Sequence, residues 1–131
     1  MSTLAVGTIK SVSSAAPVFQ NTSGTEKGQL ATCWINFTGI NTIAIKDSFN
    51  VSSITDNGVG NYQVTFANSM ANDDYAVSVT GSVSPHANGT HGTPYSSVLS
   101  TSSFTMRFFN AQASGSVTDK NDVSCIVLGG S

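Results

Sequence analysis

Charged residues are scarce in this sequence: they make up 9% of its 131 residues, and the formal net charge is −2. No basic stripe is present that could neutralise a phosphate backbone, so nucleic acid is not an expected partner. No apolar run reaches the roughly 18 residues of a membrane-spanning helix, so we expect no membrane contact. Residues 1–19 lack the continuous apolar stretch of a secretory signal. We therefore expect the chain to be made and used without secretory export.

Cysteine is equally sparse, and Cys33 and Cys125 are the two in the chain. Their spacing fits no zinc-ligand pattern. In a chain without a visible export signal, two buried thiols are favoured over a disulfide, and both interpretations stay open. His86 and His91 share one loop, where two exposed histidines are favoured over a metal cluster built with symmetry-related copies. We expect no metal and no other cofactor.

Ser, Thr, Asn and Gly are abundant, whereas good helix formers cluster nowhere. These residues favour turns and strands over helix interiors. From Thr32 onward, strand-like segments recur at intervals of about 8–12 residues, as in a sandwich or barrel-like sheet. The length suits one domain. The sequence therefore predicts a single all-β unit.

Alternation of apolar and polar residues is strongest between residues 33 and 66. In "CWINF", residues 33–37, three apolar side chains share one face, and Trp34 and Asn36 lie on the other. "TIAIKDS", residues 42–48, follows as the second strand of a hairpin. A second hairpin is predicted from Val51 to Phe66, because "DNGVG", residues 56–60, tolerates the positive φ of a tight connection.

Four further strands are expected toward the C-terminus, within residues 75–80, 95–99, 104–109 and 123–128. The last has apolar residues on both faces, with Ile126 and Leu128 opposite Val123, Cys125 and Val127. It is therefore expected to lie centrally in a sheet or to meet a neighbouring subunit with one face.

Residues 1–30 differ from the rest. Leu4, Val6 and Ile9 form a short strand-like patch, followed by small polar residues with isolated apolar ones. Alone, this segment could not bury enough surface to offset its ordering entropy. It is either a flexible leader or a segment ordered by other copies of the chain or by a larger assembly.

No nucleophile motif of the G-x-S-x-G type is present, and we expect no enzymatic activity. A carbohydrate-active enzyme would need two carboxyl groups facing each other across a groove. The carboxylates mostly lie at predicted turns, where Asp bonds its own backbone: Glu26, Asp47, Asp56, Asp73, Asp74, Asp119 and Asp122.

Two loops are the candidate ligand-binding elements, because long loops on a rigid sheet commonly carry recognition. The first, "GSVSPHANGTHGTP", offers His86, Asn88 and His91, with Tyr95 just after it. The second contributes Asp119, Lys120 and Asn121 as a weaker group. Trp34 could stack on a sugar, but packing or a subunit interface is the favoured role for it.

Residues 34–77, "WINFTGINTIAIKDSFNVSSITDNGVGNYQVTFANSMANDDYAV", resemble a module of structural proteins of tailed phages, especially those of cyanobacteria and other marine bacteria. The shared pattern is a Trp-x-Asn-Phe start and an Asn-Val-Ser-Ser-Ile-Thr-Asp hairpin. An Asn/Asp-rich turn and Tyr-Ala-Val follow. The matching residues are Trp34, Asn36, Phe37, Asn50, Val51, Ser52, Ser53, Ile54, Thr55, Asp56, Gly58, Gly60, Tyr62, Val64 and Phe66.

The resemblance implies a virion protein of the tail-fibre or receptor-binding type, working as a homotrimer with a β-sandwich head. We accordingly expect an antiparallel, jelly-roll-like sandwich at residues 31–131 and an extended attachment or trimerisation segment at residues 1–30. The expected partners are other copies of the chain, other virion proteins through residues 1–30, and a bacterial cell-surface polysaccharide. The alternative is a capsid decoration protein that stabilises the shell.

Overall fold

The computed structural model describes residues 5–10, 19–82, 95–97, 99–109 and 117–130, and these residues contain strands and turns but no helix. Most of the strands lie where the alternation of the sequence predicts them. The ten strands are β1 (Phe19–Gln20), β2 (Glu26–Gly28), β3 (Cys33–Thr38), β4 (Ala44–Phe49), β5 (Val51–Asp56), β6 (Asn61–Phe66), β7 (Tyr75–Ser82), β8 (Tyr95–Ser97), β9 (Ser103–Arg107) and β10 (Asp122–Gly129).

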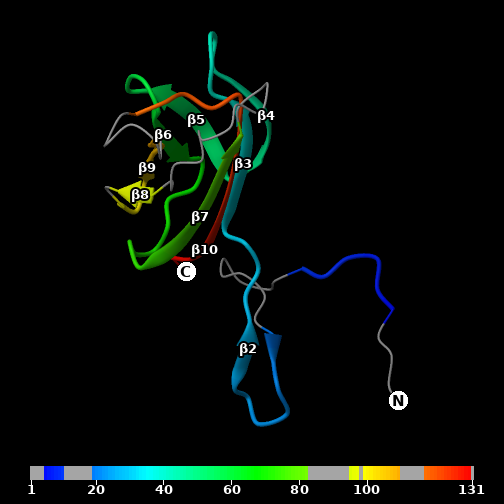
Figure 1. Cartoon of the computed structure of the whole chain (residues 1–131). Helices are drawn as coiled ribbons and strands as arrows, with labels where there is room; N and C mark the ends of the chain where they lie inside the picture. The colour runs from blue at the N-terminus through cyan, green and yellow to red at the C-terminus, as the bar shows by residue number, and fades with distance from the viewer. Residues whose placement is uncertain (1–4, 11–18, 83–94, 98, 110–116, 131) are drawn as a thin grey trace.

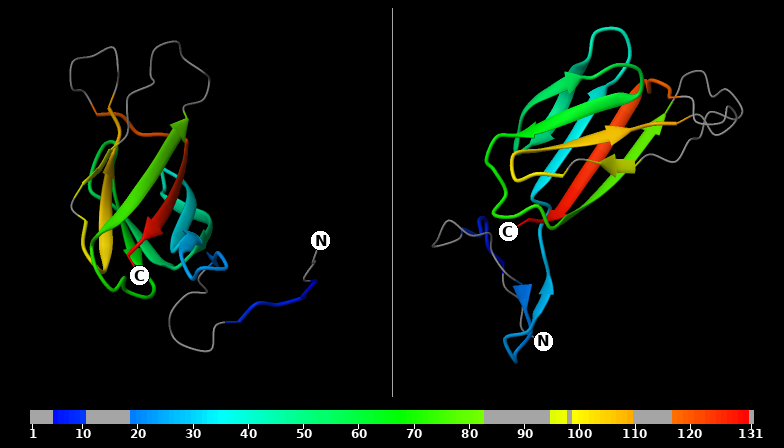
Figure 2. Two further views of the ribbon diagram at one scale, coloured as in Figure 1. Left: turned by 90° about the horizontal axis from the view of Figure 1, so that it is seen from below. Right: turned by 90° about the vertical axis from the view of Figure 1, so that its left-hand side faces the viewer.

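Strands β3 to β10 form two antiparallel four-stranded sheets that pack against each other (Figures 1 and 2). The strand order is β4-β3-β10-β7 in one sheet and β5-β6-β9-β8 in the other. Strands β1 and β2 pair in a separate small hairpin that extends away from both sheets, beyond the start of β3. We call strands β3–β10 the double-sheet domain, and residues 5–10 with 19–30 the N-terminal arm.

The predicted alternation sets the inner and outer faces of the strands. In β3, Cys33, Ile35 and Phe37 are buried while the residues between them are half-buried. In β6, Tyr62 and Val64 are buried in the same way. Because successive side chains of a strand point to opposite faces, one face of each strand enters the core. Both predicted hairpins, β3–β4 and β5–β6, are confirmed.

Aromatic side chains from the two sheets meet in the core. Phe37 of one sheet contacts Tyr62 of the other with ring centroids 5.2 Å apart, in an edge-to-face arrangement. Tyr75 likewise packs edge-to-face on Phe66 at 5.8 Å and on Phe104 at 6.5 Å. Such pairs add to the free energy gained from burying the rings, so they hold the sheets in one relative position.

Strand β10 is central, as its apolar character on both faces predicts. It pairs with β3 along Asp122–Val127 and with β7 along its whole length. The inward residues Val123 and Val127 are fully buried. The outward residues Ile126 and Leu128 remain about half exposed, at 51% and 47%.

Asn50 is the single residue between β4 and β5, where the chain passes from one sheet to the other. It has a positive φ of 57°, which Asn tolerates better than most residues. Its side-chain N–H groups donate to the carbonyls of Thr32 and Asn68, each at 3.1 Å, and its Oδ1 accepts from the Asn68 N–H at 2.7 Å. These bonds fix the crossing and also hold the start of β3.

The N-terminal arm differs from expectation in one respect. Residues 5–10 form no strand, although the spacing of Val6 and Ile9 predicts a strand-like patch. Both side chains are exposed. An isolated strand has no hydrogen-bond partner for its backbone groups. Apolar spacing alone is therefore not sufficient to form a strand at residues 5–10.

Cys33 and Cys125 are both buried and free. Burial raises the pKa of the Cys33 thiol to about 11 and that of Cys125 to about 12, from an ordinary value of 9.0. Because the thiolate is the reactive form, both cysteines are expected to resist alkylation and disulfide exchange near neutral pH.

We predict that the folded chain does not react with a thiol-specific disulfide reagent at pH 8, whereas the chain in denaturant reacts at both of its 2 cysteines. The raised pKa values also predict that stability is retained below pH 9 and falls as the pH rises toward 12. Thiol titration and denaturant midpoints measured across this range test both statements. Rapid labelling of the native chain would contradict the burial described above.

Candidate functional site

One end of the double-sheet domain gathers the connections that the sequence nominates for ligand binding. Ser82 at the end of β7 pairs with Asp122 at the start of β10, and Tyr95 at the start of β8 pairs with Arg107. The turns around Gly39 and Gly60 and the segment 117–121 lie at the same end. We call this region the loop end.

The first predicted loop gives little to describe. His86, Asn88 and His91 lie outside the described residues. Tyr95 is the first residue of β8, and its backbone pairs with Arg107. Ligand contact by these four residues stays a prediction.

Asp119 of the second predicted loop is engaged within the domain. Its Oδ1 accepts a hydrogen bond from the Gly60 N–H at 2.6 Å and lies 3.0 Å from the Tyr62 hydroxyl. A carboxylate accepting from a backbone N–H makes a strong, charge-assisted bond. Asp119 therefore fastens segment 117–121 to strand β6 and the turn before it.

The Tyr62 hydroxyl is the centre of this network. It lies 2.6 Å from the Gly39 carbonyl and accepts a longer bond from the Lys120 N–H at 3.4 Å. Burial is the main cause that raises the pKa of Tyr62, and the Asp119 carboxylate adds to the effect. The hydroxyl therefore keeps its proton, which it shares between Gly39 and Asp119.

Close backbone approach at the loop end requires glycine. Gly60 has a φ of +61°, and a Cβ there would lie 2.6 Å from the Thr118 carbonyl. At Gly39 a Cβ would lie 2.7 Å from the Lys120 carbonyl, which accepts the Gly39 N–H at 3.1 Å. Both turns therefore pack directly on segment 117–121.

Lys120 and Asn121 are also held against the domain. The Lys120 side chain is 2% exposed and packs beside Gly81, where a Cβ would meet its Cγ at 2.8 Å. Burial lowers the pKa of its ammonium group. The Asn121 N–H donates to the Ser82 carbonyl at 2.8 Å, and Asn121 is half-buried. The contacts seen for Asp119, Lys120 and Asn121 are thus internal, and ligand contact by this group stays a prediction.

Sequence reasoning missed the role of Tyr62. The alternation of β6 identifies its ring as a core residue but says nothing of its hydroxyl. The partners Gly39 and Asp119 are 23 and 57 residues away in the chain. A buried tyrosine hydroxyl needs a hydrogen-bond partner. That general requirement is the one signal in the sequence that indicates a polar network around Tyr62.

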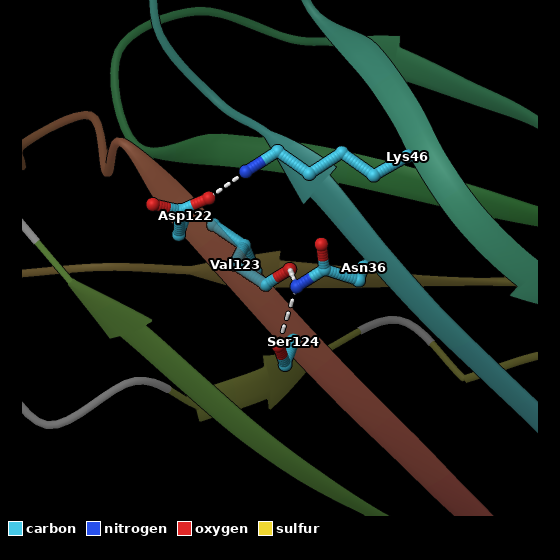
Figure 3. Close-up of polar contacts among 5 residues, drawn as sticks. All are labelled: Asn36, Lys46, Asp122, Val123 and Ser124. Atoms are coloured by element: carbon cyan, nitrogen blue, oxygen red, sulfur yellow. Dashed lines mark hydrogen bonds and ion pairs between the residues drawn. The ribbon is translucent and has the colours of Figure 1, made fainter.

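The outer face of the sheet β4-β3-β10-β7 is divided into an apolar and a polar half. The polar half contains Asn36, whose side-chain N–H group donates to Ser124 Oγ at 2.7 Å, and an ion pair between Lys46 and Asp122 (Figure 3). The pair is exposed, so its contribution to stability is small.

The apolar half lies toward the start of β3. Trp34 is paired across the strands with Phe49 on one side and Ile126 on the other, so the three side chains form a row on one face. Leu128 lies two residues beyond Ile126 on the same face. Phe49 is 54% exposed, and Trp34 is half-buried. We call these four residues the outer patch.

Comparisons with protein-family models, with curated proteins and with solved structures found no match to this chain. Within the described residues, no group of three or more His, Cys, Asp or Glu side chains is placed to hold a metal ion. The described part of the chain also contains no helix with the length and apolarity to cross a membrane.

We predict that Asp119→Ala destabilises the domain by about 1–3 kcal/mol, because the Gly60 N–H and the Tyr62 hydroxyl lose an acceptor. Asp73→Ala serves as the matched control, since it removes an exposed carboxylate outside the loop end. Chemical denaturation followed by tryptophan fluorescence measures the difference. Equal midpoints for the two variants would show that the network contributes no stability.

Proposed function

We propose that this chain is a structural protein of a phage virion, a homotrimeric short tail fibre or receptor-binding tip that attaches to bacterial surface glycans. The resemblance of residues 34–77 to a module of such proteins motivates the proposal. The structural observation that supports it is the cluster of exposed apolar side chains on the N-terminal arm and the adjoining outer patch, away from the loop end.

At one end, the N-terminal arm and the outer patch expose apolar side chains. The arm contributes Val6, Ile9, Phe19 and Leu30, all exposed. At the opposite end, internal hydrogen bonds around Tyr62 hold the bases of the loops. This arrangement suits a module that docks by its apolar end and presents its loops outward.

Hydroxyl and amide groups supply the recognition chemistry that the proposal needs. On the sheet β5-β6-β9-β8, the outward residues Gln63 and Thr65 of β6 are half-buried, and their cross-strand neighbours Thr55 and Ser53 of β5 are exposed. Such groups bond sugars without strong charge selectivity. Weak single sites suffice, because several sites on one particle raise the overall affinity by about two to four orders of magnitude.

We infer that the two packed sheets are a β-sandwich head of jelly-roll-like type. Eight strands in two sheets of four support this, as do the connections β4–β5, β6–β7, β7–β8 and β9–β10, which cross between the sheets. The arm is then the attachment or trimerisation segment, which also contacts other virion proteins.

We propose a binding role without catalysis. Most described carboxylates have partners that account for them. Asp47 and Asp56 accept from backbone N–H groups one and two residues away, as turn chemistry predicts, whereas the partners of Asp119 and Asp122 are distant in the chain. The contacts are Glu26 with Gln29, Asp47 with the Ser48 N–H, Asp56 with the Gly58 N–H, Asp119 with the Gly60 N–H, and Asp122 with Lys46. None of these contacts pairs two carboxyl groups across a groove, as glycoside hydrolysis would need.

The second candidate is a capsid decoration protein. The exposed apolar arm and outer patch favour it, because a protein that clamps shell subunits needs adhesive surface more than it needs loops. In that role the trimer would cover the head of the particle in many copies, and the loop end would have no ligand.

Immunogold labelling of intact particles separates the two candidates. The fibre proposal predicts label confined to the tail, where few copies are present. Label spread over the head would replace it with the decoration role, and particles without label would overturn both.

We predict that His86→Ala combined with His91→Ala lowers binding to host cells by about tenfold or more, since multivalency multiplies a small loss at each site. The matched control is Ser69→Ala, which removes one exposed hydroxyl from the segment after β6, at the end opposite the loops. Binding of fluorescently labelled protein to host cells gives the measurement. Unchanged binding by the double variant, with the native circular dichroism spectrum, would exclude the His86–Tyr95 region as the binding site.

A further inference from the structure

The described residues leave the outer patch uncovered. Phe49, Ile126 and Leu128 expose 54%, 51% and 47% of their surface, and they adjoin one another around Trp34. Scattered exposed apolar residues are common, but adjacent ones on a flat sheet face mark an interaction site. A strand with apolar residues on both faces, such as β10, is typical of a sheet that is covered on both sides.

The N-terminal arm is the matching element. It exposes Val6, Ile9, Phe19 and Leu30, and its own strands β1 and β2 pair only with each other among the described strands. A strand rises about 3.4 Å per residue, so the hairpin of residues 19–28, which folds back on itself, is about 15 Å long, and neighbouring strands of the sheet lie about 4.8 Å apart. The hairpin is thus long enough to lie across the apolar half of the sheet.

The arm also starts beside the outer patch. Thr32 fastens the beginning of β3 to the end of β10, with its N–H donating to the Val127 carbonyl at 3.0 Å and its hydroxyl to the Gly129 carbonyl at 2.9 Å. From this anchored residue the arm runs away from its own sheets (Figures 1 and 2). An arm that leaves one copy next to its patch is placed to reach the patch of a neighbouring copy.

We propose that the outer patch is the docking surface for the N-terminal arm of a second copy of this chain. The contact joins two different surfaces, arm and patch, so it is heterologous and closes into a ring when the rotation permits. This inference rests on the homotrimer of the proposed function and names the surfaces that would hold the trimer together. The polar half of the face, with Asn36 and the Lys46–Asp122 pair, borders the docking surface.

Light scattering of the full chain and of point variants tests the contact. The wild type is expected to have three times the chain mass of 13.5 kDa. Phe19→Ser in the arm and Ile126→Ser with Leu128→Ser in the patch are each expected to release monomers. All three side chains are substantially exposed, so folding is expected to survive, and circular dichroism checks this. Val59→Ser, an exposed apolar residue at the loop end, is the matched control and should leave the mass unchanged.

Mixing two variants tests which surfaces meet. A Phe19→Cys chain and an Ile126→Cys chain, mixed at pH 8 with oxidised glutathione as the oxidant, are expected to form a disulfide between chains. Phe19→Cys mixed with Val59→Cys should form none. The native thiols do not interfere, because burial keeps both protonated at this pH.

Three results would overturn the proposal. The first is a wild-type monomer. The second is an assembly that persists in both the arm and the patch variants. The third is dissociation by the patch variant but not by Phe19→Ser, which would mean that patches meet each other. If the assembly keeps its mass in every variant, the contact between arm and patch is excluded. The proposed function is not affected by that result, because labelling of particles tests it independently.

Discussion

The buried hydroxyl of Tyr62 is the interaction on which the organisation of the loop end depends. Its oxygen contacts three groups from two separated parts of the chain: the Gly39 carbonyl, and the Asp119 carboxylate and Lys120 N–H of neighbouring residues. Its ring packs between Phe37 and Phe108. One residue therefore links the aromatic core to the turns above it. A buried polar network of this kind is stabilising only when every member is satisfied, which makes its geometry specific.

The strands of the domain could be predicted from the sequence, because period-two alternation reports directly which side chains enter a core. Cys33, Ile35 and Phe37 are buried as the pattern requires, and so are Tyr62, Val64 and Phe66. The prediction failed at residues 5–10, where alternating apolar residues have no neighbouring strand to pair with. Alternation identifies a potential face and not the partner that covers it.

The candidate site was less accessible to prediction. The sequence identifies Asp119, Lys120 and Asn121 as loop residues. It does not show that their backbone and side chains bind Gly39, Gly60 and Ser82. These contacts join residues about 40 to 80 positions apart, and local propensity carries no information about such distances. The steric need for glycine at positions 39 and 60 likewise appears only when segment 117–121 is in place.

The pairing of β3 with β10 places the first and last strands of the domain side by side. A ribosome-bound chain therefore cannot complete this sheet until residues 122–129 have emerged, and β3 waits with one edge unpaired while some eighty intervening residues are synthesised. Contacts so distant in sequence make folding slow and leave strand edges open to other chains. The open edge of β3 is therefore the part of the domain most exposed to wrong pairing during synthesis, and it is closed only when β10 arrives.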